Sequence, residues 1–173
     1  AFIEKQYPEN IHILDLSNPS VPINISGFNF EIGENCHDIF TFENIAYISE
    51  GYSYQYGIYD ITNILNPIKL NVIPSFGYAH NAWLNNSKTH LITTEETVGM
   101  TVKIWDIQNI ENINLSGEYL GENLLAHNVH VLNNFVYISH YTTGIKIIDI
   151  YNPAQPVEVA AYDTYPYNDN DGF

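Results

Sequence analysis

The chain has 173 residues, and its 20 acidic side chains against 5 basic ones give it a formal net charge of −15. All the basic residues are lysines, so the chain lacks the basic surface that nucleic-acid binding requires. The same charge disfavours docking on anionic lipid, and no apolar stretch approaches the ~18 residues that span a bilayer. A hydrophobic fraction of 45% and an aromatic fraction of 14% indicate a folded domain. We therefore expect neither a nucleic-acid partner nor membrane insertion.

A short run of apolar residues around a single aspartate recurs along the chain. The aspartates are Asp15, Asp60, Asp106 and Asp149, at spacings of 45, 46 and 43 residues, and an asparagine follows each one three residues later. An acid at the end of a strand, followed by asparagine, is suited to bonding the amides of a turn. Four equivalent copies cannot share one active site. We therefore predict a structural role in turns for these aspartates.

A second recurring element is a histidine followed by an acid or amide, at His37, His80 and His127. A strand-like run begins nine or ten residues after each histidine, at Ala46, His90 and Val136. In the last unit the pattern predicts strands at residues 128–132, 135–139, 144–150 and 157–162, joined by short polar turns. Four short strands repeated about every 45 residues indicate an all-β fold of propeller blades. A sandwich is the alternative, but it does not require this self-similarity.

The phase of the repeat divides the chain into units. Residues 1–35 carry the third and fourth strands of a partial blade, residues 36–77, 78–123 and 124–163 form blades, and residues 164–173 lead into another. The total is about three and a half blades, whereas propellers usually close with about four to eight. An open stack would expose strand edges. We therefore expect a single propeller segment of a longer polypeptide, partnered by the remaining blades.

The motifs resemble a known bacterial repeat. The segments GIKIIDIYNP at residues 144–153 and PVEVA at 156–160 are similar to the LVIVD repeat of bacterial β-propellers. The wider series resembles the choice-of-anchor B group of exported bacterial proteins. It comprises CHDI at 36–39, AHNAW at 79–83, AHNVH at 126–130 and YDTYP at 162–166. The resemblance implies a secreted or cell-surface protein of a bacterium, with no established catalytic activity. It favours a non-catalytic module that contacts protein or glycan.

The recurring histidines support a second hypothesis, a metal-dependent enzyme of oxidoreductase or hydrolase type. In a blade, the start of the first strand lies beside the end of the second, which would bring His37 near Glu50 and His127 near His140. By the same rule His80 would lie near Glu95. Imidazoles and carboxylates that converge bind Zn²⁺, Cu²⁺ or Fe²⁺. Alternatively, each histidine donates to a carbonyl of the neighbouring blade and locks the inner ring. Both alternatives remain open at this point.

Two other features suggest ligands. Tyr52, Tyr54 and Tyr56 lie in the loop between two expected strands, where they would form a binding patch at the histidine mouth or cover a blade edge. The acidic residues 168–172 suggest Ca²⁺ as a possible ion. The EF-hand spacing fails there because Tyr167 occupies a position that requires aspartate. A looser Ca²⁺ site and a solvated loop are the alternatives.

Overall fold

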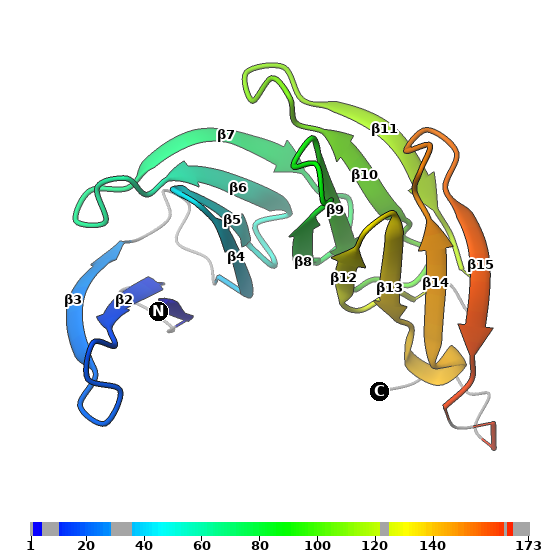
Figure 1. The fold of residues 1–173 in the computed structure, drawn as a ribbon, viewed down its shortest axis with the longest axis horizontal. Coiled ribbons are helices and arrows are strands. Elements are labelled where there is room, and N and C mark those ends of the chain that lie inside the picture. The colour runs from blue at the N-terminus through cyan, green and yellow to red at the C-terminus, as the bar shows by residue number, and fades with distance from the viewer. Residues whose placement is uncertain (1, 5–10, 29–35, 122–124, 165, 168–173) are drawn as a thin grey trace.

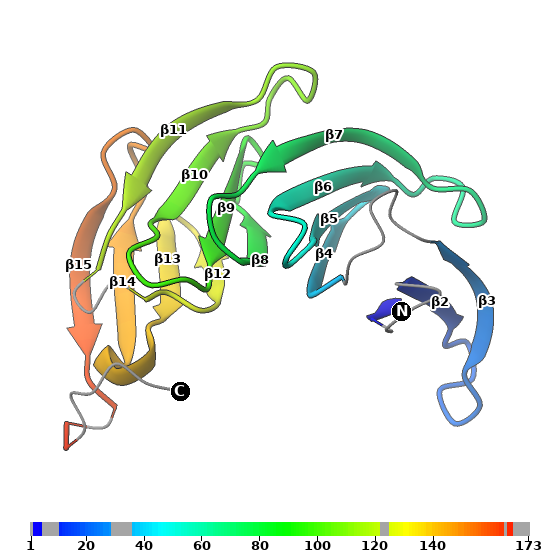
Figure 2. The same cartoon turned by 180° about the vertical axis from the view of Figure 1, so that it is seen from behind.

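The computed structural model is a curved array of antiparallel β-sheets. It describes residues 2–4, 11–28, 36–121, 125–164 and 166–167. The sheets follow one another in chain order and fan around an arc, as Figures 1 and 2 show from opposite sides. We call them the first sheet (β1–β3), the second (β4–β7), the third (β8–β11) and the fourth (β12–β15).

Every described strand pairs only with its neighbours in the chain, in the up-and-down order of a propeller blade. The strands of the first sheet are β1 (Phe2–Glu4), β2 (Ile11–Asp15) and β3 (Ile23–Phe28). Those of the second are β4 (Asp38–Phe42), β5 (Ile45–Ser49), β6 (Gln55–Asp60) and β7 (Ile68–Pro74). Those of the third are β8 (Ala79–Leu84), β9 (His90–Glu95), β10 (Val102–Asp106) and β11 (Asn114–Tyr119). Those of the fourth are β12 (Val129–Leu132), β13 (Phe135–Ser139), β14 (Ile145–Asp149) and β15 (Val157–Tyr162).

The all-β fold predicted from the sequence is confirmed, and no end of a strand in the fourth sheet differs from its predicted position by more than one residue. One correction concerns the first sheet. Only the third and fourth strands of a blade were expected there, and these are β2 and β3. Strand β1 pairs with β2 and takes the place of the second strand of the blade. At three residues, β1 is too short to show an alternating pattern. Within the described residues, helical structure is confined to the 3-10 turn Tyr141–Thr143, and no helix is long and apolar enough to cross a membrane.

The outer strand pair carries a register shift at the same place in each sheet. The shift falls one or two residues before the recurring aspartate, between Ile58 and Tyr59 in the second sheet and between Ile104 and Trp105 in the third. The first and fourth sheets repeat it at Ile13/Leu14 and Ile147/Ile148. A bulge of this kind increases the local twist of a strand. Repetition of the bulge gives the outer strands the same curvature in every sheet.

The hydrophobic core consists of the layers between neighbouring sheets. One cluster joins the first and second sheets through Ile11 and Ile48, and another joins the second and third through Tyr47 and Leu91. A third cluster joins the third and fourth sheets, where Ile92 is fully buried. Burial of apolar side chains between sheets therefore fixes how each blade sits on the next.

Candidate functional site

Three histidines form a continuous row where the innermost strands begin. His37 immediately precedes β4, His80 lies on β8, and His127 is two residues before β12. The ring centroids of His37 and His80 are 4.2 Å apart, and those of His80 and His127 are 4.1 Å apart. The repeat therefore places one imidazole from each of the second, third and fourth sheets at one mouth of the arc. We call these residues the histidine row.

Tyrosines extend the histidine row at both ends. The hydroxyl of Tyr78 lies 2.9 Å from Nδ1 of His37, in hydrogen-bond contact, and the ring of Tyr52 packs edge-on against Tyr78 at 4.6 Å. At the other end, the ring of Tyr141 packs edge-on against His127 at 5.1 Å. The mouth is thus lined by aromatic rings with nitrogen and oxygen atoms between them.

The central histidine, His80, is held neutral. Burial, together with the nearby charges of His37 and His127, lowers its pKa from the usual 6.5 to about 3. Only 4% of the residue is exposed, and its buried Nδ1 has no hydrogen-bond partner among the described residues. A neutral imidazole is the form that binds metals. His80 therefore offers lone-pair electrons without first losing a proton.

A glutamate that the repeats do not predict completes a cluster of possible ligands. Glu96 follows the end of β9, and its two carboxylate oxygens lie 3.4 Å from Nε2 of His80 and 3.6 Å from Nε2 of His127. The ligand atoms of these three residues all lie within 4.8 Å of one another. We call His80, Glu96 and His127 the ligand cluster. His37 stacks on His80 but bonds Tyr78 instead of Glu96.

Glu50 was expected near His37 as a metal ligand, and the structure corrects this expectation. The Glu50 side chain is fully buried inside the second sheet, where it accepts hydrogen bonds from Gln55 Nε2 at 2.5 Å and the Tyr59 hydroxyl at 2.9 Å. Gly57 makes room for it, because a Cβ at that position would lie 2.1 Å from the Glu50 carboxylate. The carboxylate turns inward because partners and space are provided there.

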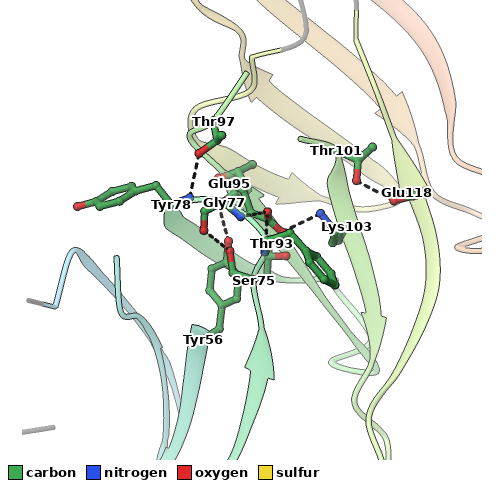
Figure 3. A network of polar contacts seen from close by, with 12 residues as sticks. Tyr56, Ser75, Gly77, Tyr78, Thr93, Glu95, Thr97, Thr101, Lys103 and Glu118 are labelled. Atoms are coloured by element: carbon green, nitrogen blue, oxygen red, sulfur yellow. Dashed lines mark hydrogen bonds and ion pairs between the residues drawn. The ribbon is translucent and has the colours of Figure 1, made fainter. Parts of the chain in front are cut away.

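Glu95, at the corresponding place in the third sheet, also turns inward. Its carboxylate accepts the backbone N–H groups of Phe76 and Gly77 and forms a buried ion pair with Lys103 at 2.7 Å. Figure 3 shows this carboxylate among the polar contacts that tie β9 to the loop before β8. Since neighbouring residues of an extended chain point to opposite sides, Glu95 faces the sheet interior and Glu96 faces the histidine row.

His140, expected beside His127 as a ligand, occupies the same interior position in the fourth sheet. The residue is 2% exposed, and its Nδ1 lies 2.8 Å from the Thr143 hydroxyl. Burial lowers its pKa. Gly121 leaves space for the ring, since a Cβ there would lie 2.5 Å from His140 Nε2. His140 therefore belongs to the interior of the fourth sheet and not to the ligand cluster.

The three loop tyrosines have different environments. Tyr52 is 65% exposed and Tyr54 is 50% exposed, which leaves both available at the surface. Tyr56, by contrast, is fully buried, and its hydroxyl donates to the carbonyl of Thr94 in the next sheet. It cannot belong to a surface patch, because it lies on β6 and faces the third sheet. This corrects the predicted three-tyrosine patch.

An open hollow of about 350 Å³ adjoins the ligand cluster. Its walls are His37, Tyr52, Tyr78, Glu96 and Thr97. Glu96 belongs to both the hollow and the ligand cluster, so a molecule in the hollow would lie beside an ion held by the cluster.

The expected Ca²⁺ segment at residues 168–172 lies outside the described residues.

The recurring aspartates act within the outer turns. Each accepts the backbone N–H two residues further on, at distances of 2.7–3.0 Å. The aspartates are Asp15, Asp60, Asp106 and Asp149. Hydrogen bonds from the turn lower the pKa of the first three, which keeps those carboxylates ionised. The asparagine three residues on makes an equivalent bond in each turn.

Comparison with known proteins identifies the repeat and the fold. The LVIVD repeat matches residues 9–29 and 125–164. The chain is thus similar to the LVIVD repeat over these two segments, about a third of its length. No curated protein sequence matches the chain.

Solved structures share the fold at low sequence identity. A functionally unknown protein from Desulfotomaculum acetoxidans is 14% identical with a TM-score of 0.68, over 94% of this chain and 52% of that one. A protein from Lactobacillus plantarum is 9% identical with a TM-score of 0.79, over 96% and 53%. The β-propeller domain of Cps50 (Swd1) from Myceliophteria thermophila is 13% identical with a TM-score of 0.63, over 88% and 51%. The chain therefore has a propeller fold and spans about half the length of these structures.

Proposed function

We propose that this chain is the part of a β-propeller that binds a divalent transition metal at His80, Glu96 and His127. The observation that supports the proposal is the spacing of the ligand atoms. The two imidazole nitrogens lie 3.4 and 3.6 Å from the two oxygens of one carboxylate. A tetrahedral ion with bonds of about 2.0–2.1 Å needs ligands about 3.3–3.4 Å apart. The three ligand atoms lie within 4.8 Å of one another, so the side chains would draw together as the ion binds.

The ligand set favours a particular class of ion. Two imidazoles and one carboxylate suit Zn²⁺, and they also suit Fe²⁺ in sites with open positions. Three protein ligands leave at least one position for water or substrate, which is typical of catalytic rather than structural zinc sites. The hollow next to Glu96 is the place where such a substrate would lie. The metal-dependent enzyme is thus the function that this geometry supports best.

A titration with Zn²⁺ tests the proposal. After removal of metals with a chelator, we expect calorimetry to show one strongly bound Zn²⁺ per chain. Glu96→Gln preserves the size of the side chain but removes a charged ligand, and we expect the affinity to fall by more than about a hundredfold, beyond the usual effect of losing an outer-shell partner. His80→Ala should act in the same direction.

Matched controls separate ligand loss from general damage. His130→Ala removes an exposed histidine three residues from His127, and Glu118→Gln removes an acid that bonds Thr101 on the outer strand pair. Both should bind Zn²⁺ as the unaltered chain does. The same Zn²⁺ affinity in Glu96→Gln and in the controls, or no Zn²⁺ binding at all, would contradict the proposal.

The second candidate is a non-catalytic module that contacts a protein or glycan. The observation in its favour is the exposure of Tyr52, which lines the hollow, and of Tyr54 in the same loop, because exposed aromatic faces are common at recognition surfaces. Binding of a protein or glycan that survives a chelator but is lost in Tyr52→Ala would support this candidate over the metal centre. Binding of a protein or glycan that is lost on adding the chelator would support the metal centre.

We also propose that the parent protein belongs to the choice-of-anchor B group and is exported to the outer cell surface of a bacterium. The support is the resemblance of the histidine-containing segments together with the LVIVD matches. Protease treatment of intact cells tests the location. Digestion of the protein from outside would agree with the proposal, whereas protection until the cells are lysed would contradict it.

A further inference from the structure

The fourth sheet has one face that no described element covers. Along β13 and β14, every second residue on this face is partly or largely exposed, at Phe135, Tyr137 and Ile145. The residues in register with Tyr137 on the second and third sheets, Tyr47 and Ile92, are 5% and 0% exposed, whereas Tyr137 is 36% exposed. The open face thus repeats positions that are buried between sheets elsewhere.

The innermost strand shows how neighbouring sheets are joined. Asn81, next to His80, donates through Nδ2 to the carboxylate of Asp38 in the second sheet at 2.6 Å. Its Oδ1 accepts the backbone N–H of Val129 in the fourth sheet at 2.9 Å. One amide side chain therefore connects three successive blades, and its acceptor atom faces the next blade along the chain.

Asn128 follows His127 and occupies the position of Asn81 one blade further on. Its Oδ1 is buried, yet it has no hydrogen-bond partner among the described residues. A buried acceptor without a partner is costly and rare in native proteins. The donor that would satisfy it, by the precedent of Val129, is the backbone N–H of the innermost strand of a following blade.

We propose that the open face of the fourth sheet is the docking surface for a further blade of the same repeat, carried by the same polypeptide. Its innermost strand donates a backbone N–H to Asn128 Oδ1, and its apolar residues cover Phe135, Tyr137 and Ile145. The solved structures agree with this occupant, because this chain covers only about half of each of those chains.

Substitution of the two equivalent asparagines tests the proposal. Asn81→Leu leaves the N–H of Val129 without its acceptor, so it should lower the midpoint of thermal unfolding of the 173-residue chain by about 2–8 °C. Asn128→Leu removes an acceptor that has no partner among the described residues, so it should not lower that midpoint in the 173-residue chain. In the natural polypeptide that carries these residues, both variants should lower the midpoint.

Three results would overturn the proposal. The first is that Asn128→Leu has no effect in the natural polypeptide, and the second is that this polypeptide carries no further blade. The third is that sedimentation shows the 173-residue chain to be a dimer that Asn128→Leu dissociates, which would make a second copy the occupant. A monomeric 173-residue chain, together with the expected pattern of midpoints, supports a further blade.

Discussion

Tyr47 in the second sheet and Tyr137 in the fourth sheet are the same residue at the same register, yet their environments differ. Each lies on the second strand of its sheet. Each pairs with an isoleucine on the third strand of the same sheet, Tyr47 with Ile58 and Tyr137 with Ile147. Tyr47 is 5% exposed within the core cluster shared with the third sheet, and Tyr137 is 36% exposed. The difference shows that burial in this fold is decided by the neighbouring blade and not by the strand itself.

The largest expected effect comes from truncating these two tyrosines. Tyr47→Ala opens a cavity between two packed sheets, and we expect it to lower the free energy of unfolding by about 3–5 kcal/mol. Tyr137→Ala removes a side chain that has no sheet packed over it, so we expect a loss of about 1 kcal/mol or less. Urea unfolding of the two variants measures both values. Equal losses would show that the fourth sheet is covered in solution.

A smaller effect is expected from two lysines that stand three residues before the recurring aspartates. Lys103 forms a buried ion pair with Glu95 in the third sheet, whereas Lys146 in the fourth lies 3.8 Å from Glu158, which is 37% exposed. Lys103→Met leaves a buried carboxylate without its cation. We expect a loss of about 3 kcal/mol, at the low end for a broken buried pair because two backbone N–H groups remain bonded to Glu95.

Lys146→Met is the matched control for Lys103→Met. We expect its free energy of unfolding to change by about 1 kcal/mol or less, because a partly exposed ion pair contributes little. Chemical denaturation in low and high salt gives a further check, since screening should weaken the exposed pair more than the buried one. A loss for Lys146→Met as large as that for Lys103→Met would remove the distinction between the two sheets.

The smallest expected effect is on how the free energy of unfolding depends on pH, and it comes from His140 in the fourth sheet. His140 stands where the second and third sheets have Glu50 and Glu95, and its burial lowers its pKa below the usual 6.5. As the pH falls below 6.5, the unfolded chain binds a proton at His140 before the folded chain does. Stability is therefore lost in that range, at no more than about 1.4 kcal/mol per pH unit for this residue.

His140→Gln tests this contribution. The variant cannot take up a proton at that position in the unfolded state, so its free energy of unfolding should fall less steeply between pH 6.5 and 5. Thermal unfolding across this range compares the two slopes. An unchanged slope would show that His140 does not contribute to the pH dependence.

Much of the fold follows from the sequence because the repeat fixes it. The spacing of the aspartates and histidines sets the blade length, and polar turns mark where each strand ends. The same reasoning placed His37, His80 and His127 at one mouth, where they form the histidine row. The burial of each blade face depends on contacts between blades, which the repeat alone does not give. Strand β1 is too short to show an alternating apolar pattern. Neither feature could therefore be predicted from the sequence.

The ligand cluster was only partly predictable for a physical reason. Glu96 has no counterpart in the other repeats, where Gly51 and Tyr141 stand at its position, so self-similarity does not mark it. The one available signal is the pair Glu95–Glu96 at a strand end, because alternation sends one acid inward and the other toward the mouth. Glu50 and His140 failed as ligands because space and hydrogen-bond partners inside their sheets hold them there.

The most direct test of the metal centre is a crystal grown with Zn²⁺ and measured at the zinc absorption edge. The geometry predicts one anomalous peak per chain, about 2.0–2.2 Å from Nε2 of His80, Nε2 of His127 and an oxygen of Glu96. Absence of a peak there in crystals that hold Zn²⁺ elsewhere would contradict the proposed centre.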